Sequence, residues 1–96
     1  MTKVQIKTAG EYLKEILDEQ NIKAIEVSEG TGISKDMMSK ILSGKRTISL
    51  ENSIRLGRYF GQSDTFWHNQ QTNRELRLLN RKLKEEFLKI TPRTTA

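Results

Sequence analysis

Cationic and hydroxyl side chains cluster between residues 34 and 47, and their types and spacing could do chemistry. That chemistry is recognition of DNA: lysine donates to guanine O6 and N7, serine pairs with several bases, and methionine can contact a thymine methyl. A basic loop and the free amides of a helix N-terminus can hold phosphates. The candidate DNA-contacting residues are Ser34, Lys35, Asp36, Met37, Ser39, Lys40, Lys45, Arg46 and Thr47. The alternative for each is a solvated surface, and Asp36 also suits the first turn of a helix, where an acid matches the helix dipole.

Other kinds of chemistry have little support in the sequence. The chain has no cysteine, which removes thiolate metal sites and thiol nucleophiles and fits a reducing compartment. His68 is the only histidine and has no cluster of acids around it. There is no phosphate-cradling glycine loop and no serine triad pattern. We therefore expect no metal, no cofactor and no enzymatic activity.

The formal net charge of +5 is distributed unevenly along the 96 residues. Residues 1–30 carry −2, residues 31–70 carry +3 and residues 71–96 carry +4. A charge that is concentrated in one part of the chain indicates a charged binding surface better than the total net charge does. We expect the middle segment to contact DNA, and the partner of the more basic tail stays open. Apolar runs are too short to span a membrane or form a signal peptide, so we expect a cytoplasmic protein with no membrane partner.

Capping residues and glycines divide the first two thirds of the chain into helices. Thr8 and Glu11 have the spacing of a capping box at the start of the first helix, which ends near Gln20. A second helix is expected over residues 24–30. Serines at 34, 49 and 63 are the predicted N-caps of the next three helices, and glycines at 44 and 61 end the third and the fourth. The expected apolar stripe of the fourth helix is Leu50, Ile54, Leu56, Gly57 and Phe60.

Residues 64–91 contain no glycine or proline. They form either one long helix or two helices with a polar bend at residues 71–73, and Pro92 ends the helical stretch. Leucines and aromatic residues recur there at helical spacing, as Leu76, Leu79, Leu83, Phe87 and Ile90. We therefore divide the chain into an N-terminal arm (1–7), which is either a short strand or loose, a helical domain (8–73), and an amphipathic helix with a frayed tail (74–96).

The second and third predicted helices fit a helix-turn-helix. Ser28 is the small residue where the two helices touch, Gly32 is the turn glycine and Ile33 is the apolar plug. Val27 and Thr31 face the core from the first helix of the pair, and Met38 and Ile41 face it from the second. In this motif the second helix lies in the major groove with its N-terminal residues at the base edges.

Several short motifs between residues 10 and 80 resemble one family. The most specific is Phe66-Trp67-His68-Asn69-Gln70-Gln71, which matches Phe-Trp-x-Asn-x-Gln after a fourth helix closed by glycine. The others are Gly10-Glu11-Tyr12-Leu13, Gly32-Ile33-Ser34, the run from Ser39 to Arg46, Ile54-Arg55-Leu56 and Phe60-Gly61. Together they resemble the HigA-type antitoxins of host-inhibition-of-growth toxin–antitoxin systems, also known as virulence-associated protein I.

The resemblance implies an all-α fold: a five-helix lambda-repressor-like helix-turn-helix (XRE) domain with a C-terminal helical extension. It also implies a homodimer that binds a palindromic operator, represses its own operon and neutralises a HigB/RelE-like mRNA endonuclease toxin. Two positions depart from the family. Ala9 stands where proline is usual, and Lys23 with Ala24 replaces a Ser/Thr-Gln pair whose glutamine contacts a phosphate. Lys23 can replace that contact electrostatically.

Apolar residues of the last third are the candidate contacts with a second copy or another partner. Phe66 and Trp67 are expected in core or dimer packing. Leu76, Leu79, Leu83 and Phe87 pack on their own domain, on a symmetric copy or on the toxin. Two further functions stay open: a solitary or phage-type repressor with no toxin, and a protein-interaction module that no longer binds DNA.

Overall fold

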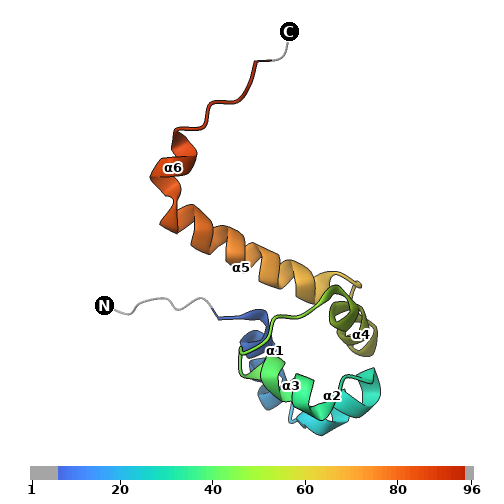
Figure 1. The fold of residues 1–96 in the computed structure, drawn as a ribbon. Coiled ribbons are helices and arrows are strands. Elements are labelled where there is room, and N and C mark those ends of the chain that lie inside the picture. The colour runs from blue at the N-terminus through green and yellow to red at the C-terminus, as the bar shows by residue number, and fades with distance from the viewer. Residues whose placement is uncertain (1–6, 95–96) are drawn as a thin grey trace, which may run out of the picture.

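The computed structural model describes residues 7–94, and every regular element in that range is a helix. These are α1 (Ala9–Glu19), α2 (Ala24–Thr31), α3 (Lys35–Leu42), α4 (Leu50–Phe60), α5 (Phe66–Lys82) and α6 (Lys84–Leu88). Figure 1 shows α1 to α4 gathered into a domain against the first turns of α5. The all-α prediction is confirmed. The N-terminal arm predicted over residues 1–7 lies outside the described residues except for Lys7.

Most of the helix boundaries follow the predicted caps. Thr8 and Glu11 make both bonds of the capping box: the Glu11 amide donates to Thr8 Oγ1 at 3.0 Å, and the Thr8 amide donates to Glu11 Oε1 at 2.9 Å. The hydroxyls of Ser34 and Ser49 each accept an amide bond at 3.1 Å. The predicted cap at Ser63 is wrong, because α5 begins three residues later, at Phe66.

The core lies between α1, α2, α3, α4 and the start of α5. Its fully buried side chains include Leu13, Val27, Met38, Ile41 and Leu56. The stripe expected on α4 is only partly right, because Leu50 and Ile54 are 58% and 39% exposed. The buried positions of α4 are Ser53, Leu56 and Gly57. Polar Ser53 takes the central position of the buried face of α4. The face predicted from the apolar residues is therefore rotated about the helix axis from the face that is buried.

Ser53 and Trp67 join α4 to α5. The Ser53 hydroxyl donates to the Asp64 carbonyl at 2.7 Å and accepts from the His68 amide at 3.1 Å. Trp67 is completely buried, and its indole N–H donates to Gln62 Oε1 at 2.7 Å. The Trp67 side chain therefore packs in the core, which is one of the two roles expected for it, and no part of it is exposed for contact with a partner. Phe66 is partly buried against the same core.

The C-terminal extension, residues 74–94, leaves the domain along α5. This helix runs through residues 71–73 without a bend, in agreement with the first of the two alternatives there, and breaks at Leu83, before α6. The break interrupts the stripe that was expected to be continuous to Ile90. Figure 1 shows the extension projecting from the domain. The radius of gyration is 16.8 Å, against about 12–13 Å for a compact chain of this length. No helix in residues 7–94 is both long and apolar enough to span a membrane.

Candidate nucleic-acid interface

The turn between α2 and α3 is held by short-range hydrogen bonds. Gly32 ends α2 with a φ of 78°, a left-handed conformation that glycine adopts without strain, and its amide donates to the Ser28 carbonyl at 2.9 Å. The Ser28 hydroxyl donates to the Ile33 carbonyl. Thr31 Oγ1 donates to the Val27 carbonyl at 2.6 Å and accepts from the Ile33 amide at 3.2 Å. Ile33 is buried, as predicted for the apolar plug.

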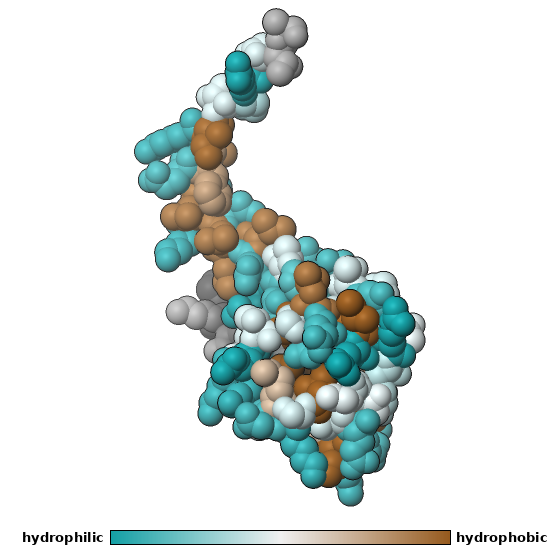
Figure 2. Space-filling model, turned by 45° about the vertical axis from the view of Figure 1, so that its right-hand side comes forward, coloured by the Kyte–Doolittle hydropathy of each residue, from teal (hydrophilic) through white to brown (hydrophobic). Residues whose placement is uncertain are grey.

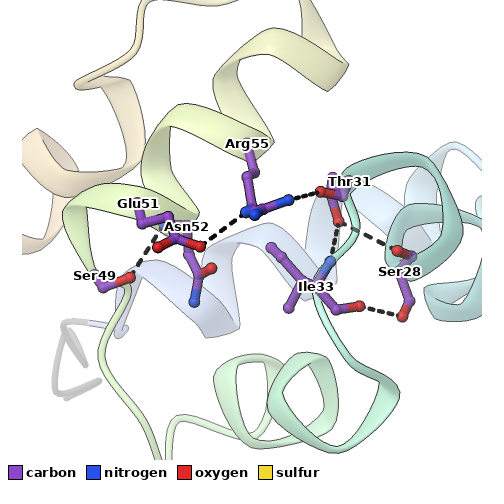
Figure 3. Close-up of polar contacts among 7 residues, drawn as sticks. All are labelled: Ser28, Thr31, Ile33, Ser49, Glu51, Asn52 and Arg55. Carbon is purple, nitrogen blue, oxygen red and sulfur yellow. Dashed lines mark hydrogen bonds and ion pairs between the residues drawn. The ribbon is translucent and has the colours of Figure 1, made fainter.

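Arg55 connects this turn to α4, as Figure 3 shows. Its Nη1 donates to the Thr31 carbonyl at 2.8 Å, and its Nε donates to Glu51 Oε2 at 3.1 Å. The guanidinium thus satisfies a carbonyl at the C-terminal end of α2, where helix carbonyls lack partners within the helix. The sequence did not predict this role. The spacing of Glu51 and Arg55 indicates their ion pair, but nothing in the sequence indicates the contact with Thr31.

The first turn of α3 presents a polar face. Lys35, Asp36 and Ser39 are exposed and Lys40 is partly exposed. Lys40 Nζ lies 2.9 Å from Asp36 Oδ2, so these two side chains pair along the helix. Met37 differs from this set, because it is partly buried against the core. The structure therefore gives Met37 a packing role that its assignment as a DNA contact did not include.

A groove of about 380 Å³ runs beside this face, between α2 and α3. Its residues include Ala24, Ile25 and Met38 on the apolar side and Lys35 and Ser39 at the polar edge. Lys23 lies at the N-cap of α2, with an exposed side chain that caps nothing. The helix-turn-helix thus places apolar surface directly beside exposed lysine and serine side chains.

The loop after α3 carries three more candidate residues, Lys45, Arg46 and Thr47, all exposed. Its start is closed by a Schellman motif at Gly44, whose φ is 79°. The Gly44 amide donates to the Ile41 carbonyl at 3.0 Å, and the Lys45 amide donates to the Lys40 carbonyl at 2.9 Å. The loop ends at Ile48, which is almost completely buried. Lys45 and Arg46 therefore lie between the closed turn at Gly44 and the buried Ile48.

The N-terminus of α1 borders the same loop. A small cavity there is lined by residues of α1, the loop and α5, among them Thr8, Gly44, Arg46 and Gln71. The backbone and hydroxyl of Thr8 hold the pKa of Glu11 below its ordinary value of 4.5, and the positive charges of Arg74 and Lys7 act in the same direction. Glu11 is therefore a carboxylate at neutral pH, close to the basic loop.

The structure separates the predicted site residues into two groups. The DNA-contact candidates lie on α3, on the loop after it and at the start of α2. The partner-contact candidates Leu76, Leu79 and Phe87 are exposed on the extension, and Leu83 is partly exposed at the break. Figure 2 shows apolar surface along the extension. Among residues 7–94, no group of three or more His, Asp and Glu residues is arranged to hold a metal ion.

Known proteins are similar to this chain in sequence and in fold. A helix-turn-helix family model matches residues 13–67. An uncharacterised HTH-type transcriptional regulator of Escherichia coli, YddM, is 32% identical over 62 residues, which are 65% of this chain and 66% of that protein.

Two solved structures resemble almost the whole chain. A HigA-family addiction module antidote protein from Coxiella burnetii has a TM-score of 0.78 at 25% identity, over 94% of this chain and 100% of that one. The Pseudomonas aeruginosa antitoxin HigA, solved with the higBA promoter, has a TM-score of 0.75 at 29% identity over the same shares.

These relatives are regulators and not enzymes, which supports the expectation that this protein is not an enzyme. The helix-turn-helix match covers more than half of the chain, and its geometry is present at the expected residues. The similarity to the solved antidote proteins extends beyond the motif into the C-terminal helices. The chain belongs to the helix-turn-helix family, and its sequence and fold are similar to those of solved HigA-family proteins.

Proposed function

We propose that the protein is the antitoxin of a type II toxin–antitoxin system and represses its own operon. In this proposal a homodimer binds a palindromic operator in the cytoplasm, and the same protein neutralises a HigB/RelE-like mRNA endonuclease. The observation that carries the DNA-binding part is the exposed first turn of α3 beside a basic loop fixed at both ends. The similarity to an antitoxin solved with its promoter supports the same conclusion.

The exposed candidate residues divide between two tasks in this proposal, base contact and phosphate contact. Lys35, Ser39 and Lys40 read base edges in the major groove, and Asp36 accepts from a cytosine amino group. Lys45, Arg46 and Thr47 bind phosphates, as do Lys23 and the Ser34 end of α3. Because two copies must place their α3 helices about 34 Å apart, the half-sites are one duplex turn from centre to centre.

The extension supplies the contacts with a second copy and with the toxin. Its exposed leucines, Leu76 and Leu79, offer the kind of apolar helix face that dimer and partner interfaces bury. Phe66, at the base of the extension, and Phe87, at its far end, are further contact candidates.

The DNA part is tested by fluorescence anisotropy with the DNA upstream of the protein's own gene and with a random duplex of equal length. We expect tighter binding to the upstream DNA, with affinity that falls steeply as salt rises, because phosphate contacts release counterions. Equal affinity for the two duplexes at every salt concentration would refute sequence-specific recognition. No binding to either duplex would leave the protein-interaction module as the better function.

A toxin-free repressor is the second candidate, and the similarity to a transcriptional regulator of Escherichia coli favours it. The product of the neighbouring open reading frame distinguishes an antitoxin from a toxin-free repressor. If the protein is an antitoxin, that frame encodes a small protein that stops growth when expressed alone, and coexpression of this chain restores growth. If no adjacent frame has this effect, the toxin-free repressor is the better assignment.

A further inference from the structure

The oxygen and the nitrogen of the Gln71 side-chain amide, on α5, both bond to the backbone of one loop residue. Gln71 Nε2 donates to the Ile48 carbonyl at 2.9 Å, and Gln71 Oε1 accepts from the Ile48 amide at 2.6 Å. Both bonds are partly buried, and 23 positions separate the two residues in the sequence. The pair resembles one rung of an antiparallel sheet, with a side-chain amide in place of the second strand.

Ile48 needs such a partner because it lies between two helices. α3 ends at Leu42 and α4 begins at Leu50, so the backbone polar groups of Ile48 have no place in either helix ladder. Its side chain is buried, and buried backbone groups are costly when they lack hydrogen bonds. Gln71 satisfies both groups at once and ties the end of the loop to α5.

This contact fixes the position of the basic loop. Its first end is closed at Gly44 by the Schellman motif, and its second end is held at Ile48 by Gln71. Only residues 45–47 lie between these points, and their side chains are exposed. A three-residue segment anchored at both ends has few conformations, so little freedom remains to be lost on binding.

We propose that Gln71 is a positioning residue for DNA binding, which holds Lys45 and Arg46 where they reach the phosphates. The proposal rests on the proposed function, because it requires that the loop contacts DNA. Gln71 itself does not touch DNA. It lowers the cost of binding by keeping the loop in its bound conformation before DNA arrives.

The test is a double-mutant comparison on operator affinity. Gln71→Met keeps nearly the volume of the side chain and removes both hydrogen bonds, and Gln70→Ala is a control that leaves the bonds to Ile48 in place. Each change is made in the natural sequence and together with Lys45→Ala and Arg46→Ala. We expect Gln71→Met to weaken operator binding about 3- to 10-fold in the natural sequence and to have no further effect once both cations are gone.

Amide hydrogen exchange measures the loop directly. We expect Gln71→Met to speed exchange at Ile48, whereas the amides of α2 keep their protection. If Gln71→Met proves too unstable to assay, Gln71→Asn keeps a neutral amide that is one methylene too short to bond both Ile48 groups, and the same non-additivity is expected of it.

Three results would overturn the inference. The first is an equal loss of affinity with and without the two loop cations, because Gln71 would then act elsewhere. The second is unchanged affinity in Gln71→Met although Lys45→Ala and Arg46→Ala weaken binding. The third is unchanged affinity in the cation variants themselves, which would also remove the loop from the proposed DNA interface.

Discussion

Asp36 and Lys40 form an ion pair on the face of α3 that is proposed to read DNA. Their side chains are 77% and 40% exposed. Exposed pairs at this helical spacing are worth only about 0.3–0.5 kcal/mol, so base edges can compete for both partners. The ion pair holds the two side chains in a defined arrangement in the free protein. Breaking it costs little free energy when DNA binds. In the proposed complex with DNA, the two side chains therefore exchange each other for base edges.

Substitution of one cation on α3 and one in the loop separates the two kinds of DNA contact. We predict that Lys40→Ala lowers affinity for the operator by about 1–3 kcal/mol with much less effect on random DNA, because a base contact is lost. Arg46→Ala is expected to weaken binding to the operator and binding to random DNA by similar factors. It should also reduce the slope of log affinity against log salt concentration by about 1. Anisotropy titrations at four salt concentrations measure both quantities. The same pattern of losses for the two variants would contradict the assignment.

The capping box predicts how stability depends on pH. The pKa of Glu11 is lowered in the folded protein by its bonds to Thr8, so its contribution is fully present above about pH 4.5 and is lost as the pH falls below that value. Glu11→Gln has no carboxylate to protonate. We expect the natural protein to be more stable than Glu11→Gln at pH 7, and the difference to shrink toward pH 3. Urea unfolding at several pH values measures it, and a difference that stays constant would exclude this origin.

At the element scale, a close approach of α1 and α3 fixes the position of α3, the helix that is proposed to read DNA. A Cβ added at Gly10 of α1 would lie 1.8 Å from the Ile41 carbonyl oxygen of α3. Only glycine permits this distance, so Gly10 determines how near the two helices pack. The backbone of α3 is thereby held at a fixed distance from α1. The first turn of α3 is exposed to solvent in this position.

Two helical glycines give a matched test of that approach. Gly10→Ala is expected to destabilise the protein by about 2–3 kcal/mol, because backbone must move to admit the methyl group. Gly30→Ala is expected to change stability by less than about 1 kcal/mol. The atoms nearest to its new Cβ belong to the ring of Tyr59, which is partly exposed and can rotate away, and alanine favours the helix. Thermal and urea unfolding measure both, and equal losses would argue against a special role for Gly10.

For the whole molecule, the DNA-facing domain and the extension are joined by α5. Trp67 at its start is buried in the domain, Gln71 one turn later holds the basic loop, and Leu76 and Leu79 beyond it are exposed. One helix therefore carries core packing, loop positioning and the proposed contact surface in succession. This order explains why α5 has no uniform apolar stripe.

Charged residues on the extension test its proposed role in assembly. We predict that the double substitution Leu76→Glu and Leu79→Glu makes the protein monomeric and weakens operator binding at least tenfold, since a dimer gains from two half-sites. The two side chains are about half exposed in the protomer, so its helical content should be unchanged. Sedimentation velocity and circular dichroism provide the two readouts. A dimer that survives both changes would place the interface elsewhere.

The local helix signals of the sequence predicted the structure best where the interaction spans only a few residues. Thr8 with Glu11, the caps Ser34 and Ser49, and the left-handed glycines are all found as predicted. The sequence was ambiguous or misleading where the partner is distant. The polar residues at 71–73 left a bend open as one of two alternatives, whereas α5 continues through them and the Gln71 side chain bonds to the backbone of Ile48. Ser53 likewise occupies a core position because Asp64 and His68 bond to it.

The sequence by itself determined the helices, the helix-turn-helix and the chemical character of its exposed face, because these depend on contacts within one or two turns of chain. The DNA contacts assigned to that face stay predictions. Only the tertiary structure decided that Trp67 belongs to the core, that Arg55 holds the end of α2 and that Gln71 fixes the basic loop. Each of these contacts depends on how α4 and α5 pack against the first three helices, and side chains far apart in the sequence meet only after that packing is set.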